Sequence, residues 1–179
     1  MEYTNTLALH LPSPALAQKA ANTLAALLDA NAKAFDKGYL AGPSAKLKTA
    51  LACHDCAIQA EGGFFTPEDI PGIMKELALG LAKALPGMEF SGTVSTDSTY
   101  AADDVTVLCA DGKLHMNDVY YPDGYVEDLC CPECGEPIVP FAEFDPDANY
   151  TCPECGEEVD LHDDYEESSP VVTENDFDV

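Results

Sequence analysis

The sequence repeats one pentapeptide, Cys-Pro-Glu-Cys-Gly, at residues 131–135 and 152–156. A proline after the first cysteine and a glycine after the second favour a tight turn that directs both sulfurs toward one point. Two such turns supply four thiolates, which is the ligand set of a closed tetrahedral Zn²⁺ site. The sequence therefore predicts one structural zinc ion, held by Cys131, Cys134, Cys152 and Cys155.

The segment 125–162 resembles the zinc ribbon family, because both of its cysteine turns, or knuckles, are complete. The resemblance implies a small fold in which metal binding supplies on the order of 10 kcal/mol of folding free energy. It implies no activity, because zinc ribbons serve transcription factors, polymerase subunits, enzymes and adaptors. Between the knuckles we expect a short hairpin built from the apolar residues Ile138, Val139, Phe141, Phe144 and Tyr150.

The four other cysteines leave alternatives open. Cys53 and Cys56 have the spacing of a metal knuckle or a redox pair but lack the proline and the glycine, so small buried thiols on a strand are the favoured interpretation. Cys109 and Cys130 could complete a second site only if the fold brought them to that pair. Cys130 could also replace Cys131 as a zinc ligand, although the complete pentapeptide favours Cys131.

Charge divides the chain into two parts. It has 33 acidic residues, 8 lysines, no arginine and a formal net charge of -25. All 8 lysines and 13 of the acids lie in residues 1–113, whereas the last 66 residues hold 20 acids and no cation. Nucleic acids and anionic membranes are bound by clustered Lys and Arg, so we expect the isolated protein to bind neither.

Localisation and catalysis are predicted from what the sequence lacks. Zinc ligation requires reduced thiolates, and we find neither an apolar span of membrane length nor a basic N-terminal leader. We therefore expect a cytoplasmic protein. No pattern of Ser, His and Asp or of paired carboxylates stands out, so we expect no enzymatic activity. The segment 53–56 is the one candidate that an enzyme hypothesis could use.

Hydrophobic periodicity predicts an α+β domain over residues 1–121. Residues 7–11 alternate as a strand, and Ser13 with Pro14 begins a long amphipathic helix that ends at Gly38. The segment 47–65 has features of both a strand and a helix, and we favour a strand. A second helix is expected from residue 67 or 71 to residue 85.

Three further strands are expected at residues 88–94, 105–110 and 113–121, the last two joined by an Asp111-Gly112 turn. This order predicts an antiparallel sheet with two helices on one face, followed by the zinc ribbon (125–162) and an acidic tail (163–179). The tail carries seven acids in 17 residues, which favours a solvated, disordered segment. The alternative is an acidic docking segment anchored by Tyr165, Val171, Val172 and Phe177.

A polyanionic surface on a rigid scaffold imitates the phosphate array of a nucleic acid. In length, acidity and the zinc ribbon, the chain is similar to inhibitors carried by phages and mobile elements, in particular the type II anti-CRISPR proteins. The resemblance implies a DNA mimic that acts in the cytoplasm of a bacterial host cell and blocks a basic partner, an RNA-guided CRISPR nuclease with its guide RNA. The partner-binding residues we expect are Glu133, Glu136, Glu154, Glu157 and Glu158.

A second hypothesis is a non-enzymatic zinc-ribbon adaptor or transcription-associated interaction protein. It would bind its partner through the apolar residues Ile138, Val139 and Phe141. Apolar contacts depend little on ionic strength, whereas attraction between an acidic surface and a basic partner weakens with added salt. Salt dependence of binding therefore distinguishes the two hypotheses.

Overall fold

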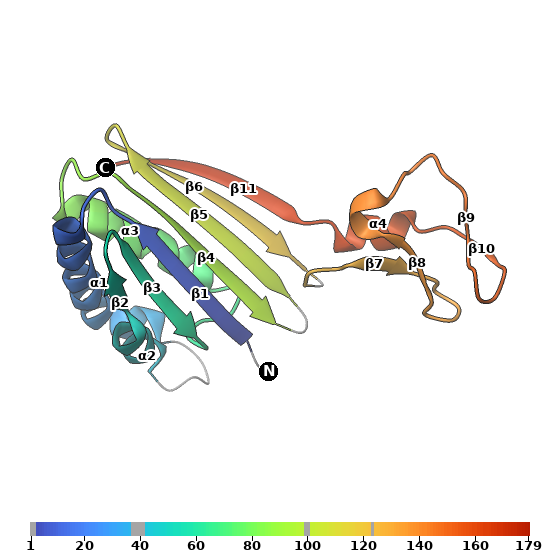
Figure 1. Cartoon of the computed structure of the whole chain (residues 1–179), viewed down its shortest axis with the longest axis horizontal. Coiled ribbons are helices and arrows are strands. Elements are labelled where there is room, and N and C mark those ends of the chain that lie inside the picture. The colour runs from blue at the N-terminus through green and yellow to red at the C-terminus, as the bar shows by residue number, and fades with distance from the viewer. Residues whose placement is uncertain (1–2, 37–41, 99–100, 123) are drawn as a thin grey trace.

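The computed structural model describes residues 3–36, 42–98, 101–122 and 124–179. Figure 1 shows a sheet with helices on one side and a smaller module that projects from one end of it. The sheet has seven antiparallel strands in the order β11-β6-β5-β4-β1-β3-β2, which confirms the predicted α+β class. Its strands are β1 (Tyr3–His10), β2 (Ala52–His54), β3 (Ala57–Gly62), β4 (Phe90–Ser98), β5 (Ala102–Ala110), β6 (Lys113–Tyr121) and β11 (Val171–Asp178).

The smaller module follows β6 and returns to the sheet at β11. We call it the four-cysteine module (residues 128–168). It consists of β7 (Asp128–Cys130), β8 (Pro137–Pro140), the 3-10 helix η1 (Phe141–Glu143), β9 (Tyr150–Thr151), β10 (Glu158–Val159) and the helix α4 (His162–Ser168). The module is therefore an insertion between two neighbouring strands of the sheet, as Figure 1 shows.

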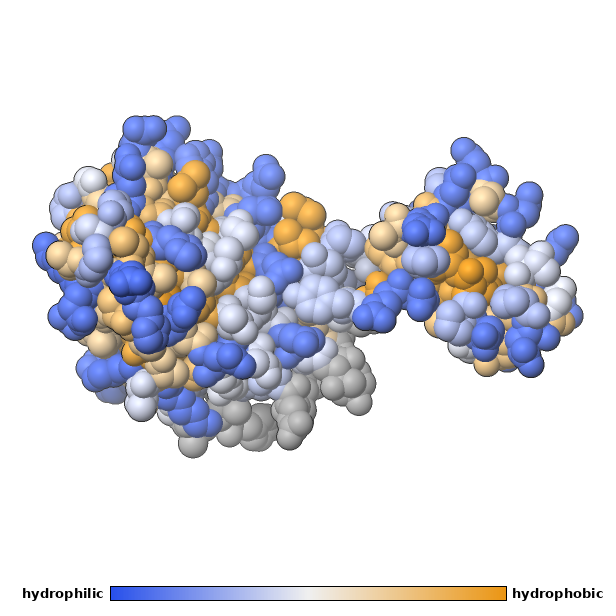
Figure 2. All heavy atoms as spheres, viewed as in Figure 1, coloured by the Kyte–Doolittle hydropathy of each residue, from blue (hydrophilic) through white to orange (hydrophobic). Residues whose placement is uncertain are grey.

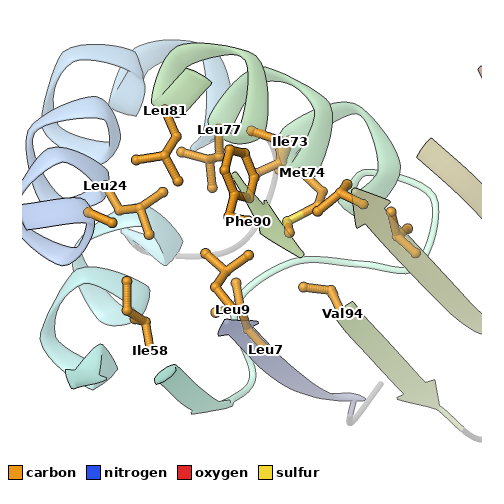
Figure 3. Close-up of a cluster of buried hydrophobic side chains, with 14 of the residues drawn as sticks. Leu7, Leu9, Leu24, Ile58, Ile73, Met74, Leu77, Leu81, Phe90 and Val94 are labelled. Atoms are coloured by element: carbon orange, nitrogen blue, oxygen red, sulfur yellow. The ribbon is translucent and has the colours of Figure 1, made fainter. Parts of the chain in front are cut away.

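The helices cover one face of the sheet. Along β4, Phe90 and Val94 are buried while Ser91 and Ser95 are exposed, so only one face is packed. The covering helices are α1 (Pro14–Phe35) and α3 (Ile70–Ala84), and α2 (Pro43–Ala50) packs beside α1. In Figure 3 side chains of α1 and α3, such as Leu24 and Leu81, meet Leu9 and Val94 of the sheet to form the core.

The first helix begins as predicted. The Ser13 hydroxyl accepts a hydrogen bond from the Leu16 N–H at 3.3 Å, and Pro14 occupies the first turn, where its missing N–H costs nothing. The helix extends to Phe35, and the predicted end at Gly38 lies outside the described residues. The strand before it, predicted at residues 7–11, is present as β1.

The strand favoured over residues 47–65 is wrong for its first part, because residues 43–50 form α2. Pro43 pre-sets the first turn, and the Asp36 carboxylate accepts a hydrogen bond from the Ser44 N–H at 2.9 Å. Leu47 then faces the core one turn after the buried Ser44, a helical spacing. The later part of the segment does form strands, β2 and β3. In the described residues the sheet is therefore accompanied by three helices and not by the two predicted.

The second predicted helix and the meander after it are confirmed. The helix starts at Ile70, so Pro71 lies in its first turn and does not kink it. Strands β4, β5 and β6 follow as a meander. At the turn between β5 and β6, Asp111 and Gly112 have φ values of 52° and 74°, the left-handed pair that an Asp-Gly hairpin turn requires.

The prediction of a disordered acidic tail is wrong. Residues 162–168 form α4, and β11 pairs in register with β6 from Val171 opposite Tyr120 to Asp178 opposite Lys113. Composition favoured disorder because the tail has few apolar residues, but backbone pairing with an existing strand satisfies its N–H and C=O groups without a large apolar face.

In the described part of the chain no helix is long and apolar enough to cross a membrane.

Candidate metal centre

The two knuckles have nearly the same backbone geometry. In the first, the Gly135 N–H donates to the Cys131 carbonyl at 2.8 Å, and in the second the Gly156 N–H donates to the Cys152 carbonyl at 2.9 Å. The two glycines have φ values of 76° and 75°, a left-handed conformation that a side chain would strain. The glycine in each pentapeptide is therefore what closes the turn.

The four cysteines that the sequence assigns to zinc lie together. Their sulfur atoms all lie within 4.8 Å of one another. The Cys134 and Cys152 sulfurs are 3.5 Å apart, and the Cys131 and Cys155 sulfurs are 3.8 Å apart. A tetrahedron with metal–sulfur distances of about 2.3 Å has edges of about 3.8 Å, so the four sulfurs form a metal site whose donor set and size fit zinc.

Protonation of the site is set by backbone N–H groups and by neighbouring sulfurs. The N–H of Cys155 lowers the pKa of Cys152 to about 7, helped by the N–H of Glu154 and opposed by desolvation. For Cys134 the N–H of Glu136 acts in the lowering direction, but the nearby sulfurs and desolvation outweigh it and raise the pKa to about 12. Four crowded sulfurs do not all ionise together without a cation, so metal binding and proton release are linked.

The single hairpin expected between the knuckles is wrong, because each knuckle is the turn of its own hairpin. Strands β7 and β8 flank the first knuckle, and β9 and β10 flank the second. The physical reason is the chain reversal at each knuckle: the Cys131 N–H donates to the Glu136 carbonyl, and the Cys152 N–H donates to the Glu157 carbonyl. The spacer therefore contributes one strand to each hairpin.

An aromatic stack supports the site from the side of α4. Tyr165 stacks on Phe141 and Phe144, with ring centroids 4.7 and 4.5 Å apart, and Leu161 before it is 1% exposed. Phe144 also meets His162 edge to face. Sequence reasoning treated Tyr165 as a tail residue that could anchor a partner, but the structure places it inside the module. Phe141, which the adaptor hypothesis assigned to partner binding, belongs to the same aromatic stack.

The other cysteines do not join the cluster. Cys53 lies on β2 and Cys56 lies in the turn between β2 and β3, and both are half-buried. Cys109 is buried on β5, with its thiol 3.6 Å from the Met88 carbonyl. Cys130 lies outside the group of four sulfurs, whereas Cys131 belongs to it, in agreement with the sequence-based choice of Cys131 as the ligand. Among the described residues, the four knuckle cysteines are the one group of three or more potential ligands that could hold a metal ion.

The five glutamates expected to bind a partner lie within the two knuckles or directly after them. All five are exposed, and none makes an ion pair in the described part of the chain: Glu133, Glu136, Glu154, Glu157 and Glu158. Figure 2 shows hydrophilic residues at the periphery of the module and hydrophobic residues toward its centre. Four thiolates and one Zn²⁺ carry a net charge of -2, so the metal does not neutralise this surface.

The structure also brings together two carboxyl groups that sequence reasoning missed. Asp103 on β5 and Asp118 on β6 face the helices, and Asp103 is 1% exposed. Desolvation, followed by the charge and hydrogen bond of Asp118, raises the pKa of Asp103 to about 8, so it holds a proton beside the Asp118 carboxylate. Strand alternation could have revealed the pair, because Asp103 continues the inward series of Val105 and Val107.

Comparisons of the chain with protein-family models, with curated proteins and with solved structures find no match. The function therefore has to be argued from the chemistry and the placement of the residues themselves.

Proposed function

We propose that this protein is a zinc-stabilised, acidic binding protein whose four-cysteine module docks on the nucleic-acid-binding surface of a basic protein and blocks it. The partner class is a guide-loaded CRISPR nuclease, and the mechanism is occupation of channels where Lys and Arg otherwise hold nucleic acid. The protein would act by binding alone, as an anti-CRISPR inhibitor of phage or mobile-element origin does.

The observation that carries this proposal is the placement of exposed glutamates within the two knuckles and directly after them. Glu133 and Glu154 occupy the same position in the two knuckles, and Glu136 and Glu157 follow the two glycines. The knuckle hydrogen bonds and the four sulfurs hold these side chains on a preorganised scaffold. A rigid array of unpaired carboxylates loses little entropy when it meets a basic groove, and it raises the association rate by electrostatic attraction.

The test is a variant in which the five glutamates become glutamine: Glu133→Gln, Glu136→Gln, Glu154→Gln, Glu157→Gln and Glu158→Gln. Glutamine keeps the shape and hydrogen-bonding capacity, so the module should still bind zinc. Its affinity for a purified guide-loaded nuclease should fall about tenfold or more, mainly through slower association, and should depend less on salt. Inhibition of DNA cleavage should weaken in parallel.

A charge-matched control removes five exposed acids from the sheet, its helices and their connections instead: Glu61→Gln, Glu68→Gln, Glu76→Gln, Glu89→Gln and Asp111→Asn. This control has the same net charge as the first variant and should inhibit like the parent. If both variants inhibit like the parent with unchanged salt dependence, the glutamates are only a solvated face. Binding that persists without salt dependence would favour the adaptor hypothesis.

A further inference from the structure

Strand β11 is a regular edge strand whose outer side is open. Its eight residues pair with β6, and on its other side the described residues place no neighbouring strand. The pairing with β6 runs without a register shift, and the strand contains no proline. An edge of this kind presents a row of N–H and C=O groups to which another extended chain can pair.

Both faces of β11 are also open over most of its length. Val171 and Val172 are each 57% exposed, and of its eight residues only Phe177 is half-buried. The helical layer reaches the strand only there, where the Lys75 ammonium lies 4.7 Å from the centre of the Phe177 ring. Within the described part of the chain, no helix or loop therefore covers the remaining residues of β11 against a chain that pairs with it.

The charges on β11 decide which chain fits. Glu174, Asp176 and Asp178 alternate along the strand and point to the face opposite the helices, where the Asp176 carboxylate also lies 2.6 Å from a ring nitrogen of His115 on β6. Two β11 strands paired antiparallel about Asn175 would place Glu174 opposite Asp176, so a second copy is repelled. Edge strands in other proteins are commonly protected by lysine or proline, whereas this one is protected by acids alone, which repel acidic strands and attract basic ones.

We infer that β11 binds an extended basic peptide segment of a partner protein by strand addition, with Lys or Arg at alternate positions opposite Glu174, Asp176 and Asp178. Main-chain hydrogen bonds would supply affinity, and the alternating cations would select the sequence and its register. The residue opposite Val172 would be apolar. This inference does not rest on the proposed function, because it involves neither zinc nor the glutamates of the four-cysteine module.

The test uses a capped peptide with the sequence Lys-Thr-Lys-Thr-Lys-Thr-Val-Thr and the full-length protein. Binding is measured by fluorescence anisotropy, and the site is located by amide hydrogen exchange. The control peptide has proline in place of each threonine, which keeps the three charges but prevents ladder formation. We expect the first peptide to slow exchange in β11 and to bind at least about tenfold more tightly than the proline peptide.

The matched protein variant carries Glu174→Gln, Asp176→Asn and Asp178→Asn, and it should bind the first peptide about tenfold more weakly. The five-glutamine variant of the four-cysteine module should bind that peptide like the parent, so failure of the proposed function and failure of this inference give different results. Equal binding of the two peptides, or unchanged exchange in β11, would overturn the inference. Self-association of the parent through β11 would overturn it as well.

Discussion

The sheet and the four-cysteine module are stabilised in different ways. The sheet buries a continuous apolar cluster between its strands and the helices α1 and α3. The module is an acidic segment that concentrates its buried groups around four sulfurs and a small aromatic stack. The comparison indicates that a chain with net charge -25 can keep a compact acidic region folded if a metal site replaces most of an apolar core.

The largest effect that separates the two regions is expected from loss of one zinc ligand. Cys152→Ser should reduce the zinc content from one equivalent per chain to nearly none, because three thiolates hold the ion much less tightly. The module should then become sensitive to proteolysis, while α1, α3 and the central strands remain folded. Metal analysis and limited proteolysis measure both effects, and zinc content equal to the parent's would contradict the assignment.

The converse change is made in the core of the sheet. Leu81 of α3 is fully buried, and Leu81→Ala should lower the free energy of unfolding by about 2–5 kcal/mol because it leaves a cavity. Below the unfolding transition, the variant should still bind one zinc ion. Urea denaturation with parallel metal analysis checks this, and loss of zinc before the sheet unfolds would show that the two regions are not stabilised separately.

A pH effect should arise in the sheet from Asp103. Its folded-state pKa of about 8 exceeds the ordinary value near 4, so the folded state holds an extra proton between these values. Stability should therefore fall as the pH rises through this window. Asp103→Asn supplies a permanently neutral donor to Asp118 and should gain about 1–3 kcal/mol at pH 8.5 relative to the parent. Denaturation at pH 6 and pH 8.5 measures the difference, which should be smaller at pH 6.

The smallest effect concerns the attachment of α4 to the module. Tyr165→Leu keeps an apolar side chain but removes the stacking on Phe141 and Phe144, which should cost about 1 kcal/mol. The variant should bind zinc and show faster amide exchange in α4. Unchanged exchange would indicate that Leu161, and not the aromatic stack, holds the helix.

Most of the features that were predicted correctly from the sequence depend on short local patterns. The two pentapeptides specified the four metal ligands because a knuckle is formed by residues that are neighbours in sequence. Ser13 with Pro14 specified the start of α1, and Asp111 with Gly112 specified a hairpin turn, for the same reason. In each case the backbone conformation and its hydrogen bonds depend on a few adjacent residues.

The remaining features depended on contacts between residues far apart in sequence. Residues 171–178 became β11 only because β6, 51 to 65 residues earlier, offered a free edge in a compatible register. Asp103 and Asp118 became a proton-sharing pair only when β5 and β6 aligned. Acidic composition could not predict either outcome, because composition measures the cost of burying charge and says nothing about which backbone or carboxyl group lies opposite. Strand pairing in the tertiary structure decided which residue lies opposite each of these residues and how deeply its side chain is buried.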